Sequence, residues 1–124
     1  MKILKCHCGD IKAEINLEGA PQKVLKCNCS ICKRKGAIMS MVKNEDFRII
    51  KGKDKLKIYQ FHSNVAKHFF CSNCGIYTHH NPRSNPAMTG FNVGCIDEIN
   101  TFELKDVAVN DGHNHPLDKK NEKA

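Results

Sequence analysis

Three short stretches decide the fold of this chain: Cys6-His7-Cys8-Gly9, Cys27-Asn28-Cys29-Ser30-Ile31-Cys32 and Cys71-Ser72-Asn73-Cys74-Gly75. Together they contain seven of its eight cysteines. Thiolates at C-x-C and C-x-x-C spacing can converge on one soft cation with little strain, whereas a disulfide inside C-x-C closes a very small ring at unfavourable Cα and Cβ separations. We expect zinc, which accepts tetrahedral sulfur ligands, because iron–sulfur centres usually use C-x-x-C runs.

Two of the three clusters end in glycine. Gly9 follows Cys8 and Gly75 follows Cys74, and glycine tolerates the positive φ that turns backbone N–H groups toward thiolates in a zinc knuckle. Four sulfurs fill a tetrahedral shell and leave no open position, which is the arrangement of a structural zinc site. The predicted ligands of this first site are Cys6, Cys8, Cys71 and Cys74.

The middle cluster supplies three sulfurs and has no obvious fourth ligand. An incomplete shell is typical of a catalytic zinc, which keeps a position for water or substrate. Lys33, Arg34 and Lys35 follow directly, and their charge favours an anionic thiol as the fourth ligand and could also hold its carboxylates. A thiol bound there loses its proton and becomes a nucleophile. The predicted ligands of this second site are Cys27, Cys29 and Cys32.

The alternative for the middle cluster is a second closed structural site, completed by Cys95 or by one of the seven histidines. A lone cysteine such as Cys95, inside a predicted strand, is otherwise a small buried hydrophobic residue. His7 is expected to point away from the metal of the first site. The pairs His79-His80 and His113-Asn114-His115-Pro116 are expected beside the ligands or in loops, and His79 or His115 as a proton shuttle stays open.

The composition indicates one small domain. With 124 residues, 40% of them hydrophobic and no tryptophan, the core is expected to be thin, so metal ions would add to its stability. We expect a single zinc domain over residues 1–118 and a loosely ordered basic tail over 119–124. No apolar targeting segment precedes Cys6, and no stretch approaches the ~18 apolar residues of a membrane span. We therefore expect a cytoplasmic protein with no membrane partner, whose cysteines bind metal rather than form disulfides.

The positive charge is a weak sign of nucleic-acid binding. Seven thiolates and two Zn²⁺ ions together lower the formal net charge by three, from +7 to +4. Lysines alternate over residues 51–57, which is typical of a solvated edge strand or hairpin. Few aromatic residues are present for base stacking, and none is interleaved with a cluster of lysine and arginine. A nucleic-acid partner is therefore not expected.

Apolar residues alternate with polar ones along most of the chain, which predicts a mainly β protein. One short helix is expected after Ser30, with Ser30 as N-cap and Gly36 as its end. The expected strands fall within 11–17, 38–42, 47–50, 56–61, 65–70, 76–79 and 88–93, with a further extended segment over 102–109.

The order of these motifs resembles the glutathione-dependent formaldehyde-activating (GFA) family, which includes centromere protein V. The matching elements are C-H-C-G at 6–9, C-x-C-S-x-C with basic residues and glycine at 27–36, F-C-x-x-C-G at 70–75 and N-V-G-C-I-D at 92–97. Segments 78–86 and 111–116 look like those of bacterial members. The resemblance covers most of the chain.

The resemblance implies an Mss4-like β-tent of antiparallel sheets stapled by two zinc ions. By position it assigns the first four cysteines to the structural zinc and the middle three to the active-site zinc. It also implies carbon–sulfur lyase chemistry, in which glutathione adds to formaldehyde to give S-hydroxymethylglutathione. The partners would be glutathione or a similar small thiol, and a small aldehyde.

Our mechanistic hypothesis is that zinc at Cys27, Cys29 and Cys32 lowers the pKa of a small thiol and orients it toward the aldehyde. Lys33, Arg34 and Arg83 would hold the carboxylates of the thiol. No general acid is evident next to the triplet, and His79, His80 or Asp97 are the candidates. The alternatives are a glutathione carrier without turnover and a zinc-stabilised module that binds protein or nucleic acid.

Overall fold

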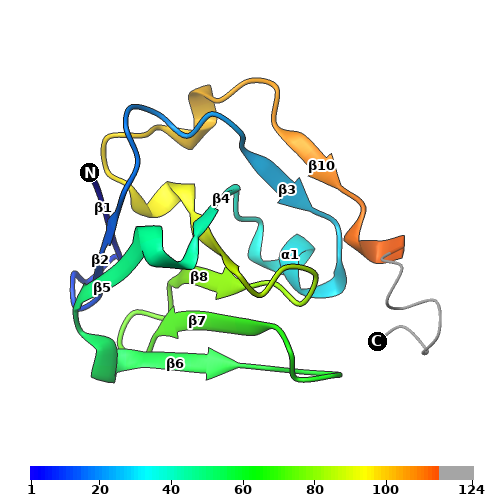
Figure 1. The fold of residues 1–124 in the computed structure, drawn as a ribbon, viewed down its shortest axis with the longest axis horizontal. Helices are drawn as coiled ribbons and strands as arrows, with labels where there is room; N and C mark the ends of the chain where they lie inside the picture. The colour runs from blue at the N-terminus through cyan, green and yellow to red at the C-terminus, as the bar shows by residue number, and fades with distance from the viewer. Residues whose placement is uncertain (115–124) are drawn as a thin grey trace.

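The computed structural model describes residues 1–114, whose strands form two sheets (Figure 1). The smaller sheet is antiparallel and has the order β1-β2-β5. Its strands are β1 (Lys2–Lys5), β2 (Lys12–Ile15) and β5 (Phe47–Lys51). In β2, Ala13 and Ile15 are fully buried while Glu14 faces outward and pairs with Arg48 at 2.7 Å. The alternation of the sequence therefore sets which face of this sheet meets the core.

The larger sheet has seven strands in the order β10-β3-β4-β9-β8-β7-β6. The strands are β3 (Leu25–Cys27), β4 (Met39–Lys43), β6 (Leu56–Tyr59), β7 (Lys67–Cys71), β8 (Tyr77–Asn81), β9 (Met88–Asn92) and β10 (Ala108–Asn110). All neighbours are antiparallel except β10 and β3, which run parallel, side by side in Figure 1. The predicted mainly β, tent-like fold is confirmed, with one mixed edge that the antiparallel prediction did not include.

Helical segments are short. The α-helix α1 (Ser30–Lys35) ends at Gly36, which has φ +64°, as predicted. Its N-cap is Cys29 rather than Ser30, because the Cys29 Sγ accepts a hydrogen bond from the Cys32 backbone N–H at 3.4 Å. The 3₁₀ turns are η1 (Asn44–Asp46), η2 (Lys53–Lys55), η3 (Val93–Cys95), η4 (Thr101–Glu103) and η5 (Gly112–Asn114). Within the described residues no helix is both long and apolar enough to span a membrane.

Two differences from the strand prediction have local causes. Residues 102–109 are extended only at their end, because the Asn100 side chain accepts from the Phe102 N–H at 3.1 Å and starts the turn η4. Strand β3 was not predicted, since three residues are too few to show an alternating pattern, and strand β1 was not predicted either. The lysine-rich segment does end in an edge strand, β6, as expected. Residues 115–124, including the predicted boundary at 118, the tail and His115, lie outside the described residues.

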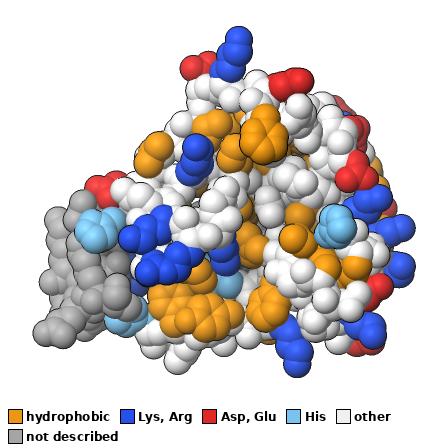
Figure 2. Space-filling view, turned by 180° about the vertical axis from the view of Figure 1, so that it is seen from behind, with side chains coloured by type: hydrophobic (Ala, Val, Ile, Leu, Met, Phe, Trp, Pro, Cys, Tyr) orange, Lys and Arg blue, Asp and Glu red, His pale blue; other side chains and the backbone are white. Residues whose placement is uncertain are grey.

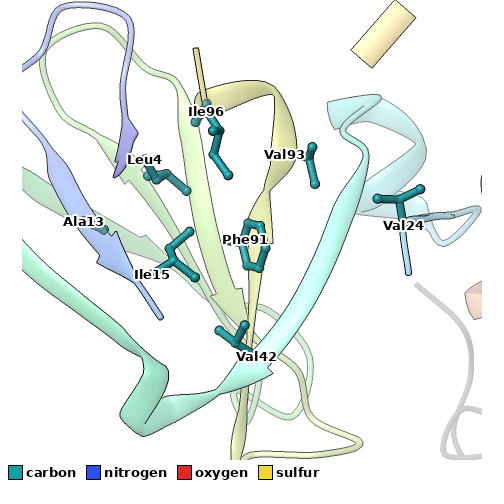
Figure 3. Close-up of a cluster of buried hydrophobic side chains, with 9 residues drawn as sticks. Leu4, Ala13, Ile15, Val24, Val42, Phe91, Val93 and Ile96 are labelled. Atoms are coloured by element: carbon teal, nitrogen blue, oxygen red, sulfur yellow. The ribbon is translucent and has the colours of Figure 1, made fainter. Parts of the chain in front are cut away.

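The main core lies between the two sheets (Figure 3). Leu4 and Ile15 of the small sheet point toward Phe91 of β9, and all three are fully buried. Val93 and Ile96, from η3 and the residue after it, close the same cluster. A second cluster contains Cys6, Ile11 and Cys71, packed against Leu56 and Cys74. Two cysteines of the first predicted metal site, Cys6 and Cys71, are therefore part of the hydrophobic interior, while Cys8 is exposed.

Candidate metal centres

The first candidate centre joins two distant turns. Cys6 and Cys8 follow β1, Cys71 ends β7, and Cys74 lies in the next turn. The four sulfurs lie within 4.8 Å of one another, with Cys6 Sγ to Cys8 Sγ at 3.6 Å and Cys8 Sγ to Cys71 Sγ at 3.7 Å. The structure thus brings together the four cysteines that the sequence grouped.

The surroundings of the first centre suit a four-thiolate metal site. The Ile11 N–H donates to Cys6 Sγ at 3.3 Å, and the Asn73 N–H donates to Cys71 Sγ at 3.4 Å. Gly9 and Gly75 have φ of +84° and +77°, which their place after the second cysteine of each motif predicted. Backbone donors to sulfur stabilise thiolate ligands. The four soft donors and these N–H groups therefore fit zinc, and the centre has no open position.

The second candidate centre lies where β3 meets α1. Cys27 ends β3, Cys29 caps the helix and Cys32 lies within it, and their sulfurs are within 4.8 Å of one another. Among the described residues no fourth cysteine, histidine or carboxylate joins the group. Cys95 is buried elsewhere, in the turn η3 rather than the predicted strand, with its Sγ 3.6 Å from the Tyr77 carbonyl oxygen. Cys95 therefore does not complete the shell.

The three sulfurs of this centre strongly perturb one another. Hydrogen bonds from Cys29 and Cys32 hold the pKa of Cys27 far below its ordinary value, and the same contacts raise the pKa of Cys32. Three thiolates crowded this closely repel one another unless a cation lies between them. The donor set therefore fits a soft divalent metal with one free position.

A C-terminal segment, residues 108–113, closes over this centre, and we call it the strap. Its strand β10 pairs with β3, and the Asn28 N–H donates to the Asn110 carbonyl at 3.2 Å. The Asn28 side chain holds both sides of the next turn: its Nδ2 donates to Asp111 at 3.2 Å and its Oδ1 accepts from the His113 N–H at 2.9 Å. The side chain between the first and second cysteines of C-N-C-S-x-C thus ties the strap to the site.

Gly112 of the strap lies directly against the sulfurs. A Cβ placed at this buried position would lie 2.4 Å from Cys27 Sγ and 2.9 Å from Cys29 Cβ. No larger side chain fits without moving a sulfur, so the glycine is required by close approach and not by its own φ. No spacing in the sequence pointed to Gly112 as part of this site.

A cavity of about 360 Å³ adjoins the triplet. Of the three basic residues predicted to hold carboxylates, Arg83 lines this cavity. Lys33 and Arg34 are exposed on α1 and do not line it, and Arg34 Nη1 donates to the Ser30 carbonyl at 2.7 Å. Besides the three cysteines and Arg83, the lining consists of Leu25, Ser30, Ile31, Met39, Met41, Phe61, His62, Ser63, Ala66, His68, His80, Pro82, Ser84, Asn85, Asn110, Gly112 and His113.

A polar network of partly buried side chains lies beside the cavity; the sequence had pointed to Lys35 and His80 but not to His68 or Tyr77. Lys35 Nζ is 3.1 Å from Nδ1 of His68 and 3.4 Å above the ring centroid of Tyr77. Tyr77 Oη is 2.6 Å from Nδ1 of His80, and the His68 and His80 rings stack 5.6 Å apart. Burial lowers the pKa of Lys35 to about 8, of His68 to about 3 and of His80 to about 4. At neutral pH the histidines are neutral and Lys35 carries the proton.

The other acid candidates lie away from the cavity. His79 is 5% exposed, stacked on Phe69 with centroids 4.3 Å apart and tilted against Phe47 at 4.6 Å. Asp97 is exposed and pairs with Lys5 at 2.9 Å. Neither lines the cavity, and of the three predicted acids only His80 does.

Fold and sites together define a class: a small β-tent domain with a closed four-cysteine centre and an open three-cysteine centre. A model of the family described as glutathione-dependent formaldehyde-activating enzyme matches residues 1–110. The chain belongs to this family. It is also similar to a protein of Rhodobacter sphaeroides with a crystal structure, at 40% identity and a TM-score of 0.82 over 87% of this chain and 99% of that one.

Proposed function

We propose that this protein is a zinc-dependent carbon–sulfur lyase-type enzyme that adds glutathione, or a similar small thiol, to an aldehyde. The observation that carries the proposal is the open three-cysteine centre at the cavity of about 360 Å³. When bound at Cys27, Cys29 and Cys32, zinc would supply a Lewis acid that favours the thiolate form of the substrate at neutral pH. Zinc at Cys6, Cys8, Cys71 and Cys74 would be structural.

The basic residues around the triplet suit the carboxylates of the thiol. Arg83 lines the cavity, so we assign it one carboxylate, which a guanidinium can bind through two parallel hydrogen bonds. Lys33 and Arg34 lie on α1 next to Cys32 and add positive charge beside the site. Their direct contact with the thiol stays a prediction. Eight free cysteines suit the reducing cytoplasm, where we place the protein.

The buried network can supply the proton that the addition needs. The Lys35 ammonium can only donate, so Nδ1 of His68 accepts and neutral His68 carries its proton on Nε2. We assign His68 as general acid: Nε2–H protonates the carbonyl oxygen while Lys35 passes a proton to Nδ1, so no imidazolate forms. The S–C bond forms and the C=O π bond breaks. The proton that the thiol releases when it becomes a thiolate balances the proton that Lys35 gives to His68, so the reaction consumes no net proton.

A native mass spectrum with and without glutathione tests the proposal. We expect two zinc ions per chain and one glutathione adduct. Cys29→Ser keeps a helix-capping oxygen but removes a thiolate, so we expect it to lose the adduct and the second zinc while the fold persists. Cys95→Ser, outside both centres, is the matched control and should keep both. Global unfolding of C29S would contradict the separate roles of the two centres.

Other outcomes separate the alternatives. Two zincs with no adduct would indicate a closed structural module that binds protein or nucleic acid. A glutathione adduct with no acceleration of aldehyde addition would indicate a carrier. In Figure 2, lysine and arginine side chains lie in several separate groups with acidic and hydrophobic side chains between them. That face offers no continuous basic track for a phosphate backbone.

A further inference from the structure

The wall of the cavity near the triplet is apolar. Leu25 of β3, Met39 and Met41 of β4, and Phe61 and Ala66 of the β6–β7 connection all line it. Among the described residues that line the cavity, Arg83 is the one lysine, arginine, aspartate or glutamate, so none of them is an acidic residue that could receive an ammonium group. Glutathione carries two carboxylates and one ammonium, so it leaves most of this wall unused.

The apolar wall combines a fixed surface with an adaptable one. The Phe61 ring stacks on His68 with centroids 5.8 Å apart and on Tyr59 at 5.7 Å, which holds it in place. Met39 and Met41, which line the same cavity, carry flexible thioether chains that fit groups of different shape. Such a wall suits a flat or linear hydrocarbon group.

The apolar wall meets the polar network at Gly90. A Cβ at Gly90 would lie 2.3 Å from His80 Cε1 and 2.9 Å from Met41 Sδ, so the missing side chain makes room for both. The cavity that holds the cysteine triplet also contains both histidines, so an aldehyde whose oxygen reaches the histidines and whose carbon reaches the thiol can place its remaining substituent against this apolar wall.

We infer that the aldehyde substrate carries an apolar group of about three to six carbons, or a phenyl ring, bound against Met39, Met41 and Phe61. The inference rests on the proposed function and narrows its substrate class. Formaldehyde has no substituent and would leave this wall in contact with water. The product is a hemithioacetal, formed by the same addition of S–H across C=O with no oxidant, reductant or leaving group.

The test is a series of aldehydes, from formaldehyde through propanal, pentanal and benzaldehyde, with glutathione and the zinc-loaded protein. Exchange NMR measures the rate of adduct formation above the spontaneous rate. Burying a methylene gives about 0.8 kcal/mol, so we expect kcat/KM to rise up to about fourfold per carbon until the cavity is filled. The series uses the wild-type protein and needs no variant.

A polar replacement of similar size localises the effect. Met41→Gln should lower kcat/KM for pentanal by about tenfold and change that for formaldehyde less than twofold. Ile58→Gln, an exposed apolar-to-polar change on β6, is the matched control and should leave both unchanged. If formaldehyde is the best substrate, the inference is wrong and the proposed function stands. If glutathione binds but no aldehyde reacts faster, both the lyase proposal and the inference are wrong.

Discussion

Gly112→Ala is the sharpest single change in this structure, because it adds one carbon at the second centre and removes no ligand. The new Cβ would lie 2.4 Å from Cys27 Sγ, and an ordinary contact begins at 3.4 Å. The strap and the sulfur must therefore separate by about 1 Å. Metal–ligand distances in a working site are held within about 0.2 Å, so the second centre cannot absorb this shift without losing ligand geometry.

We expect G112A to weaken zinc at the second centre and to spare the first. Overpacking of this kind costs about 1–3 kcal/mol, which corresponds to roughly 5- to 160-fold in zinc affinity. Competition with a chromophoric chelator, with native mass spectra to count ions, measures the two affinities separately. Gly94→Ala is the control, since its Cβ would meet nothing closer than 3.3 Å. If G112A keeps both zincs at wild-type affinity, the strap is not part of the centre.

Three further changes test other parts of the molecule. Cys71→Ser should lower the free energy of unfolding by about 4 kcal/mol, because metal at the first centre closes a long loop as a cross-link does. The Tm should then fall by roughly 15 °C, and an unchanged Tm would contradict a structural role for this centre. His79→Phe should make the free energy of unfolding depend less on pH below pH 6.5. Burial lowers the pKa of His79 in the folded protein to about 3, so below pH 6.5 the unfolded chain binds a proton that the folded chain does not. Between pH 6 and 4 the free energy of unfolding of wild type should therefore fall by up to about 1.4 kcal/mol per pH unit relative to that of H79F, as measured by urea titrations. Equal pH dependence of the two proteins would refute this. Lys35→Met should reduce kcat by about 100-fold and leave glutathione binding intact, because His68 loses its proton source. A lowered affinity for glutathione with an unchanged kcat would instead assign Lys35 to substrate binding.

The sequence predicted the parts of this fold that are local. Cysteine spacing determined both sulfur groups, and alternation located the longer strands. Gly36 marked the end of the helix because an αL residue there favours glycine. The N-cap was wrong by one residue because the sulfur of a cysteine, Cys29, took the position that a serine oxygen usually fills. The parallel pairing of β10 with β3 could not be predicted, since each strand has only three residues.

The residues that form the cavity wall could not be predicted from the sequence for a different reason. Met41, Phe61 and His68 come from two strands and a loop, and they meet only because β4, β9, β8 and β7 are neighbours in the sheet. No short spacing links them. Lys35 was grouped with its charged neighbours on α1, although its Nζ contacts Tyr77 and His68. Its different environment follows from tertiary packing alone.

The strap also gives the chain an order of assembly during translation. All four sulfurs of the first centre have been synthesised once residue 74 is added, while the second centre waits for Gly112 and its neighbours. Ribosomes add about 5–20 residues per second, so roughly 40 residues of delay amount to about 2–8 s. During that interval the four sulfurs of the first centre are all present, while Cys27, Cys29 and Cys32 still lack the strap, so the first centre can be completed before the second is covered.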